Sequence, residues 1–176
     1  ATSQEATHGL THITGYNQGI PSKAGQSFVD FLACWTCMLA AALALRHRQR
    51  TGRGQWIDLG MYQLGCYTTG EYILDWQANR RLGDRIGNRH PWSAPQGCYP
   101  CTGVDQWCVL SVGDDEEWEG LCQALGRTNL LNDPRLSSRS GRLTHHDEID
   151  SVISSWSRTR DKFHVMEILQ SHGVPS

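Results

Sequence analysis

The chain has 176 residues, of which 39% are hydrophobic and 19% are charged, with 18 glycines and 6 prolines. A chain of this length buries roughly two-thirds of its unfolded surface, so it can form a core without disulfides or metal, and its composition excludes disorder, collagen and coiled coil. Sixteen basic and 18 acidic residues give a net charge of -2, which provides no electrostatic reason to expect nucleic acid or an anionic membrane as a partner.

The cysteines indicate a reducing compartment. There are seven, an odd number, spread from Cys34 to Cys122, which predicts free thiols and a cytoplasmic protein. Residues 1–25 have no basic start followed by an apolar stretch, so we expect no secretory signal. The first residue is not Met and the last residues form no distinct tail, which suggests a piece of a longer protein.

The strongest local feature is the apolar run at residues 31–45, which is followed by a basic cluster at residues 46–50. The run is shorter than the roughly 20 residues that a membrane span needs, and Asp30 stands at its start. A helix that is apolar on every side is otherwise buried in a large core or in a subunit interface. We therefore expect a long buried helix here, and no membrane association.

The next segments predict a connector. Residues 55–59 have the composition of a short strand, and residues 61–80 have that of one long helix, although glycines weaken this prediction. Residues 82–97 are rich in Gly, Arg, Asn and Pro and fit no regular element.

The second half predicts a small α+β unit. Residues 98–101 and 107–112 flank a turn and form a plausible hairpin. Asp114, with Glu117 three residues on, predicts a capped helix that ends at Gly126. Residues 143–156 and 160–172 have helical spacing, and Gly173 stops the last helix. The predicted fold class is α+β: a long buried helix and connector in residues 1–80, then a small antiparallel sheet with helices in residues 81–176.

Two features resemble metal sites but have simpler explanations. Two Cys-x-x-Cys pairs, at Cys34 and Cys98, could supply four thiolates to zinc, but the first pair lies in an apolar helical run, where cysteine behaves as a small hydrophobe. The eight histidines have no ligand spacing, and His145 and His146 are expected to face solvent. Acidic residues 114–117 fit the positive end of a helix dipole. We predict no metal.

Asp30 and the loop at residues 85–91 have two possible interpretations each. Asp30 has the position and the chemistry of a helix N-cap. A carboxylate at a helix N-terminus also stays ionised, and an ionised, partly desolvated carboxylate can act as a nucleophile. The loop contains Gly87, which permits close approach of a ligand, although most loops of this kind are connectors.

Taken in order along the chain, several segments resemble the class III CoA-transferase family, also called CaiB/BaiF, which includes formyl-CoA transferase, carnitine CoA-transferase and α-methylacyl-CoA racemase. The resemblance covers the middle of that family and nearly the whole of this chain. The combination of residues 51–55 with residues 87–91 is its most specific part. The segments are Thr14-Gly15, Val29-Asp30, residues 39–43, 46–55, 57–58, 85–91, 94–97, Trp118, residues 121–122, 125–126, 133–135, Arg142, Leu169 and residues 173–175.

The resemblance implies a Rossmann-like CoA domain built from the two ends of a longer chain, most of which these residues would lack, and interlocked homodimers. Asp30 occupies the position of the family's catalytic aspartate by its register to residues 51–55. It would attack an acyl-CoA thioester and carry the CoA as an aspartyl thioester until a carboxylic acid accepts it. Acyl-CoA and a carboxylic acid are the implied substrates, with no metal.

The same resemblance assigns a lid over the substrate. In formyl-CoA transferase the corresponding loop is glycine-rich and shields the intermediate from water. Only Gly87 and Gly97 are glycines within residues 87–97, so we expect a less mobile lid and an acid other than formate or oxalate. The predicted lid residues are Gly87, Asn88, Arg89, Pro95, Gln96 and Gly97.

Two alternatives stay open at this point. The racemase branch uses the equivalent aspartate with an upstream histidine to exchange the proton next to the thioester, and that histidine would lie outside this chain. The chain could also be a non-catalytic module that dimerises through residues 31–45. In each case we expect the 176 residues to be weakly active or inactive by themselves.

Overall fold

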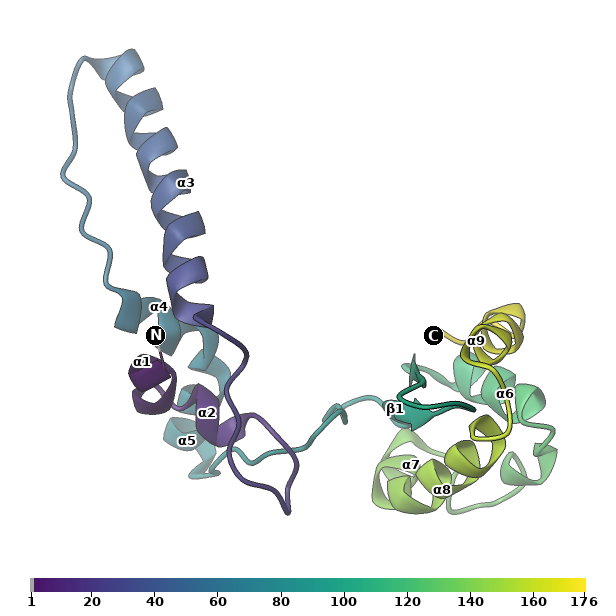
Figure 1. The fold of residues 1–176 in the computed structure, drawn as a ribbon. Coiled ribbons are helices and arrows are strands. Elements are labelled where there is room, and N and C mark those ends of the chain that lie inside the picture. Colours follow the sequence, from purple (N-terminus) through teal and green to yellow (C-terminus); the bar gives the residue numbers. More distant parts are fainter. Residues whose placement is uncertain (1) are drawn as a thin grey trace. The chain divides into compact units, whose positions relative to one another are not determined.

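A computed structural model describes residues 2–176, which divide into two compact units. The N-terminal unit ends at Gly87, and the C-terminal unit comprises Asn88–Ser176 (Figure 1). The sequence predicted a boundary after residue 80. The division falls instead inside the Arg-Ile-Gly-Asn-Arg motif at residues 85–89, so the two halves of that motif belong to different units.

All regular elements described in the N-terminal unit are helices. They are α1 (Thr2–Thr7), α2 (Leu10–Ile13), α3 (Phe28–Thr51), α4 (Met61–Thr68) and α5 (Gly70–Asn79). The single helix predicted for residues 61–80 is wrong, because the chain breaks at Thr69. The hydroxyl of Thr69 donates to the carbonyl of His8 at 3.0 Å, which fastens the break to the end of α1.

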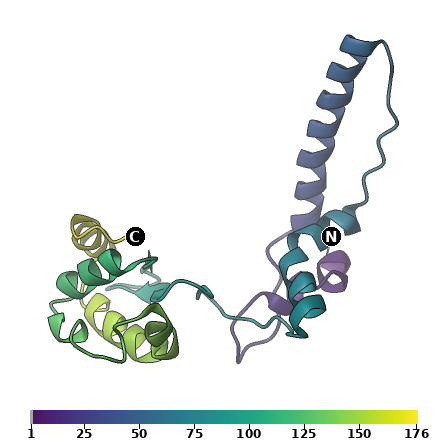
Figure 2. The same ribbon diagram turned by 180° about the vertical axis from the view of Figure 1, so that it is seen from behind.

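Helix α3 is the longest element, and it is mostly exposed. It ends at Gly52, whose positive φ of 73° lets its N–H donate to the carbonyl of Arg48. Residues 52–60 then run back beside the helix to α4 (Figures 1 and 2). The strand predicted at residues 55–59 is wrong: the segment is extended but pairs with no other strand in the described chain.

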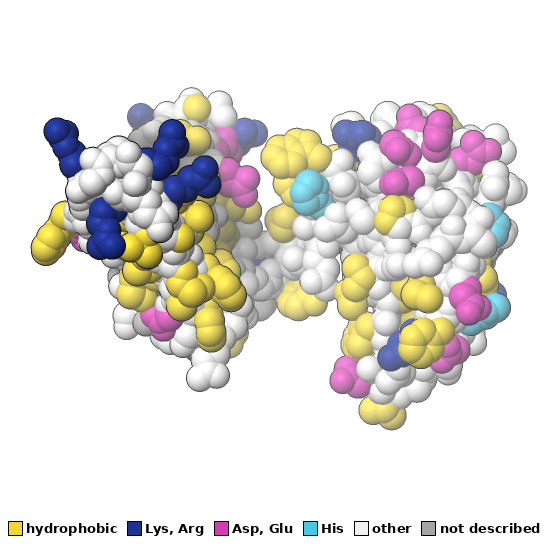
Figure 3. All heavy atoms as spheres, turned by 90° about the horizontal axis from the view of Figure 1, so that it is seen from above, with side chains coloured by type: hydrophobic (Ala, Val, Ile, Leu, Met, Phe, Trp, Pro, Cys, Tyr) yellow, Lys and Arg dark blue, Asp and Glu magenta, His cyan; other side chains and the backbone are white. Residues whose placement is uncertain are grey.

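The prediction that this helix is buried is also wrong for the described chain. Within α3 only Val29 and Ala33 are buried, both near its first turn. The rest exposes large apolar side chains, because no described segment packs against them. Figure 3 shows this apolar surface next to the basic residues that end the helix. The exposed apolar side chains of α3 are those of Phe31, Trp35, Met38, Leu39, Leu43 and Leu45.

The length and composition of α3 are also sufficient to cross a membrane. An 18-residue window of the helix has a mean hydropathy of 2.0, and 11% of that window is buried. The core helix of a soluble protein can pass the same test, so the finding describes the helix without assigning it an environment.

The C-terminal unit packs helices against a two-stranded sheet. Its elements are β1 (Gln96–Pro100), β2 (Trp107–Ser111), α6 (Asp115–Ala124), the short 3₁₀ helix η1 (Thr128–Leu130), α7 (Arg139–Thr144), α8 (His146–Ser157) and α9 (Lys162–Ser171). The strands are antiparallel with Gln96 opposite Ser111, which confirms the predicted hairpin. Alternate strand residues point inward, and Tyr99 and Leu110 join the core.

Side-chain caps define where these helices begin. The Asp114 carboxylate accepts from the Glu117 N–H at 2.9 Å, which confirms the predicted cap of α6. The predicted helix at residues 143–156 is instead two helices that meet at His145. Helix α9 starts after Asp161, which caps two backbone N–H groups, and ends before Gly173 as predicted.

The chain returns to the hairpin after α9. The Val174 side chain is buried in the core, and the Ser111 N–H donates to the carbonyl of Pro175 at 3.1 Å. On the other flank, the Val112 N–H donates to the carbonyl of Pro95 at 2.9 Å. The core of this unit is therefore closed by segments from both of its ends.

Candidate functional site

Asp30 lies in the first turn of α3, on the half-buried side of the helix. The N-cap of α3 is Ser27, in a left-handed conformation, so the prediction that Asp30 caps the helix is wrong. The Asp30 N–H donates to the carbonyl of Ser27 at 3.1 Å, and the neighbouring Val29 is fully buried. The first turn of a helix lies at the positive end of the helix dipole.

The segment that leads into α3 is fixed by α1 and by its own turns. The Ala24 N–H donates to Oε2 of Glu5, a buried carboxylate on α1, at 3.3 Å. The Ser22 N–H donates to the carbonyl of Thr14 at 3.0 Å. These bonds set the entry of the chain into the helix, and thereby the place of Asp30.

The first half of the predicted loop is fastened to the same unit. The Arg85 guanidinium donates from Nη1 to the carbonyl of His12 at 3.0 Å and from Nε to that of Tyr16 at 3.3 Å. The Gly87 N–H donates to the carbonyl of Gly15 at 2.9 Å, and a Cβ at Gly87 would collide with the Tyr16 ring. The Thr14-Gly15 and Arg85-to-Gly87 segments therefore meet.

The second half of the predicted loop is held by α8. Arg89 Nη2 contacts the carboxylates of Asp147 and Asp150 at 2.5 and 2.6 Å. Hydrogen bonding from Arg89 lowers the pKa of Asp147. The Tyr99 hydroxyl donates to the other oxygen of Asp150 at 2.7 Å, and burial together with this bond raises the pKa of Tyr99. Arg89 is thus held by ion pairs with two carboxylates of α8.

His146 anchors the end of the same segment. It is 3% exposed, so the prediction that it faces solvent is wrong. His146 is the first residue of α8, and its side chain points toward β1. Its Nε2 accepts from the Gln96 N–H at 3.1 Å, and burial lowers the pKa of His146, which favours the neutral acceptor. The Gln96 side-chain oxygen also accepts from the Ser111 hydroxyl at 3.0 Å.

The predicted lid residues lie partly in an irregular segment and partly in strand β1. Gln96 and Gly97 belong to strand β1, which corrects their assignment to an irregular segment, and Pro95 is fully buried. A Cβ at Gly97 would meet the Tyr99 hydroxyl, so glycine leaves room for that ring. Arg89 is held by α8, and Asn88 opens the C-terminal unit.

Asp30 and Gly87 belong to the N-terminal unit, whereas Asn88, Arg89, Pro95, Gln96 and Gly97 belong to the C-terminal unit. Sequence reasoning missed Tyr99, His146 and Asp150. The spacing of Asp147 and Asp150, three residues apart on one helix, was the signal that could have indicated a shared cation.

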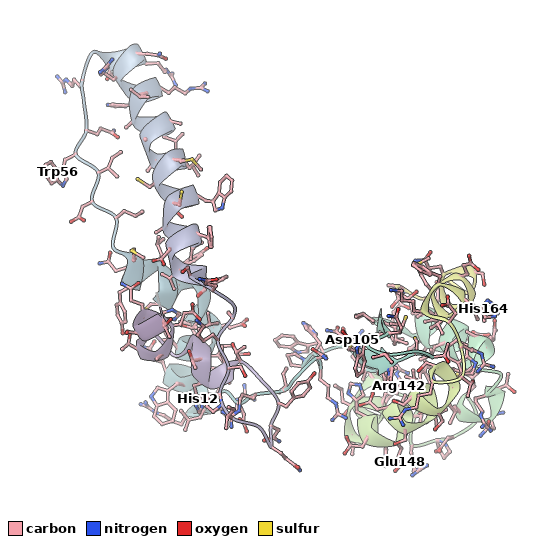
Figure 4. All side chains as sticks on the ribbon, in the orientation of Figure 1. His12, Trp56, Asp105, Arg142, Glu148 and His164 are labelled. Carbon is pink, nitrogen blue, oxygen red and sulfur yellow. The ribbon has the colours of Figure 1, made fainter. Side chains whose placement is uncertain are left out.

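A buried cation, Arg142, lies in the core of the C-terminal unit (Figure 4). Arg142 is 1% exposed, and its Nη2 contacts Asp115 at 2.7 Å while its guanidinium lies over the Trp118 ring. Arg142 and Trp118 both carry the family resemblance, so those matches identify core packing and not a reactive site. Among residues 2–176 no group of three or more His, Cys, Asp or Glu side chains could hold a metal ion.

Solved structures define the class of fold. The crystal structure of a CAIB/BAIF family protein from Brucella suis aligns with a TM-score of 0.83 and 24% identity, covering 98% of this chain and 45% of that one. Rv3272 from Mycobacterium tuberculosis aligns with a TM-score of 0.77 and 22% identity, covering 98% and 44%. The fold of this chain is thus similar to that of a CaiB/BaiF family protein.

The family assignment follows from sequence comparison. The chain belongs to CoA-transferase family III, whose model matches residues 1–176, and the predicted resemblance is confirmed. It is 34% identical to succinyl-CoA–D-citramalate CoA-transferase of Chloroflexus aurantiacus, over 98% of this chain and 42% of that protein. It is 28% identical to acetyl-CoA:oxalate CoA-transferase of Acetobacter aceti, over 99% and 44%. The chain spans less than half the length of these relatives.

Proposed function

We propose that the protein containing this chain transfers CoA from an acyl-CoA thioester to a carboxylic acid, with Asp30 as the nucleophile. The observation that carries the proposal is the family match over all 176 residues together with the position of Asp30 in the first turn of α3. The relatives described above are transferases by name, which favours transfer over racemisation.

The reaction divides into four exchanges at carbonyl carbon. The Asp30 carboxylate attacks the thioester carbon, the C–S bond breaks, and a mixed anhydride and CoA thiolate form. The thiolate attacks the Asp30 carbonyl carbon, releases the donor acid and leaves an aspartyl-CoA thioester. The acceptor carboxylate then displaces the thiolate to form a second anhydride. The thiolate finally attacks the acceptor acyl carbon, which yields the new acyl-CoA and restores the Asp30 carboxylate.

The position of Asp30 suits this role. An attacking carboxylate must be ionised and accessible, and Asp30 is half-buried at the positive end of a 24-residue helix. The backbone N–H of Asp30 donates to the carbonyl of Ser27. The segment that precedes α3 is fixed to α1 by the hydrogen bond from the Ala24 N–H to Glu5. A fixed backbone position lowers the entropy that is lost when the residue attacks.

The names of the relatives suggest which acids to try. Citramalate and oxalate are named in the two transferases described above. Glutarate is named in a further relative, the succinate–glutarate CoA-transferase of Agrobacterium fabrum, which is 28% identical over 96% of this chain and 42% of that protein. All three are dicarboxylic acids, so a dicarboxylic acceptor is the class we propose. The reduced glycine content of residues 87–97, compared with the lid of formyl-CoA transferase, favours an acid other than formate or oxalate.

We also propose that the 176 residues have weak or no activity by themselves and that the complete enzyme is a homodimer. The support is the length of the relatives, of which this chain covers 42–44%. The exposed apolar surface of α3 is a second support, because a surface of that kind is normally covered by other protein.

Intact-mass spectrometry after incubation with succinyl-CoA and acetyl-CoA tests the nucleophile. We expect a covalent adduct with the mass of CoA less water, absent from Asp30→Asn and retained in Glu167→Gln, an exposed acid on α9. An adduct that persists in Asp30→Asn would refute the role of Asp30.

A chimera tests the proposal if the isolated chain forms no adduct. This chain would replace the matching 42% of the Chloroflexus citramalate transferase, and CoA transfer would be measured with and without Asp30→Asn. A folded chimera that transfers CoA only with Asp30 supports the proposal. A folded chimera with no transfer would favour the non-catalytic module.

A further inference from the structure

A second candidate site lies in the C-terminal unit, on the side of α8 next to the end of α6. It is an open hollow of about 550 Å³, which is within the range of small-molecule sites. It contains no residue of the predicted CoA-transfer site. Its lining residues are Leu125, Gly126, Arg127, Ser151, Val152, Ser155, Trp156 and Arg160.

One of its two arginines is already fixed in place. The Arg160 guanidinium lies over the Trp156 ring, 4.7 Å from its centroid. Its Nη1 donates to the carbonyl of Trp156 at 2.6 Å and to the Thr159 hydroxyl at 3.1 Å. In residues 2–176 no carboxylate pairs with it, and its Nε and Nη2 donate to no acceptor. Those two N–H-bearing atoms are free to bind a ligand.

The second arginine also has no acidic partner. Arg127 follows the turn at Gly126, where φ is 64°, and its backbone N–H donates to the carbonyl of Cys122 at 2.9 Å. This bond fixes where its side chain leaves the backbone. Within the described chain its guanidinium makes no ion pair and no hydrogen bond. Two uncompensated positive charges therefore line one hollow.

The remaining lining is mostly apolar or already hydrogen-bonded. Leu125 is buried in the core, and Val152 and Trp156 pack against it. The hydroxyls of Ser151 and Ser155 each donate at 2.8 Å to the carbonyl four residues earlier. The apolar part of the exposed lining comes from Val152 and Trp156, and the free donors are concentrated on the arginines.

We propose that this hollow binds a phosphate monoester carried on a small apolar body. A phosphate monoester has a charge of about -1.5 to -2 at pH 7, which matches two guanidinium groups better than a single carboxylate does. Guanidinium groups donate paired N–H bonds to phosphate oxygens, and a pre-fixed donor loses little entropy on binding. The site is independent of Asp30 and goes beyond the proposed CoA transfer.

Isothermal titration of the full chain with phenyl phosphate tests the proposal. We expect binding that weakens with salt, and we expect Arg127→Gln or Arg160→Gln to weaken it about tenfold or more, as the loss of a charged hydrogen bond does. Arg158→Gln is the matched control, because Arg158 is exposed and does not line the hollow. Its affinity should equal that of the parent chain.

Two further ligands measure the contributions of the apolar body and of the phosphate group separately. Phenol carries the apolar body alone and should not bind, whereas inorganic phosphate should bind more weakly than phenyl phosphate. Arg127 is an exposed residue, so Arg127→Gln keeps the test valid even if Arg160→Gln does not fold. No binding of phenyl phosphate at millimolar concentration, equal binding by phenol, or unchanged affinity in Arg127→Gln would each overturn the proposal.

Discussion

The two units differ in how completely they cover their apolar side chains. In the C-terminal unit Trp118 is 4% exposed and packs in a core that even encloses a guanidinium. In the N-terminal unit Trp35, on the most apolar helix of the chain, is 69% exposed. A side chain is buried only where other elements reach it from several directions, and α6 has such neighbours while most of α3 has none. Most apolar side chains of α3 thus lack the covering that the core of the C-terminal unit provides for Trp118.

The largest effect should come from Arg142, in the closed core. We expect Arg142→Ala to lower the free energy of unfolding of the C-terminal unit by about 3 kcal/mol, because a large buried side chain and its contact with Trp118 are lost. Urea unfolding followed by tryptophan fluorescence measures this.

Its ion-pair partner provides the control. The Asp115 carboxylate is mostly exposed, and asparagine keeps an oxygen that can accept from the buried Arg142, so Asp115→Asn should cost about 1–2 kcal/mol, less than Arg142→Ala. Equal losses in the two variants would mean that the ion pair, and not the packing of Arg142, stabilises this core.

Two glycine-to-alanine substitutions test the same difference between the units, and we expect their effects on stability to be smaller. A Cβ at Gly120 would collide with the carbonyl of His172, so Gly120→Ala should destabilise by about 1–3 kcal/mol. A Cβ at Gly70, in α5, meets nothing, so Gly70→Ala should be neutral or stabilise by up to about 1 kcal/mol. Thermal unfolding monitored by circular dichroism compares them, and a stable Gly120→Ala would contradict the close packing of α6 against the end of α9.

The pH dependence of the C-terminal unit should depend on His146. Burial lowers the pKa of His146 below its usual 6.5, so the unfolded chain takes up the proton first and stability falls as the pH drops through 6.5. Arg89 lowers the pKa of Asp147, whose contribution is lost only at pH values below its usual 3.8. Between pH 7.5 and 5, His146→Asn should therefore lose less stability than the parent chain in urea titrations. Parallel profiles would exclude His146 as the cause.

The smallest effect on stability should come from α3. Replacing Leu39 and Leu43, both exposed, by lysine should change the free energy of unfolding by less than about 0.5 kcal/mol. The same double variant should self-associate less and bind less of an apolar dye, because the exposed apolar patch is reduced. Light scattering measures association. A large loss of stability would show that α3 is covered in solution.

Much of the C-terminal unit could be predicted from sequence because its signals are local. The alternation in residues 107–112 predicts β2, and Asp114 with Glu117 predicts the start of α6. The burial of His146 could not be predicted, since it depends on the Gln96 N–H, 50 residues away in the chain. Tertiary contacts of this kind leave no periodic trace in the sequence.

The N-terminal unit was harder to predict because composition does not reveal neighbours. Residues 31–45 predict a helix correctly, but their apolar character predicted burial that the described chain does not provide. Asp30 was found by its register within a family motif, whereas its helix position was misjudged by one turn because Ser27 adopts the capping place. The division of the loop at residues 85–91 between the two units could not be predicted, because it depends on the partners of Arg85 and Arg89, which lie far from them in the chain.

The placement of the tryptophans allows their fluorescence to report whether α3 is covered. Trp35 on α3 and Trp56, which is 92% exposed in the extended segment at residues 52–60, emit from a watery environment, while Trp118 emits from a dry one. Any surface that covers α3, whether protein or lipid, should shift the emission of Trp35 toward the blue and shield it from acrylamide. Trp118 should be equally shielded before and after. A variant that keeps only Trp35 and Trp118 would therefore register the encounter through its own fluorescence, without any added dye.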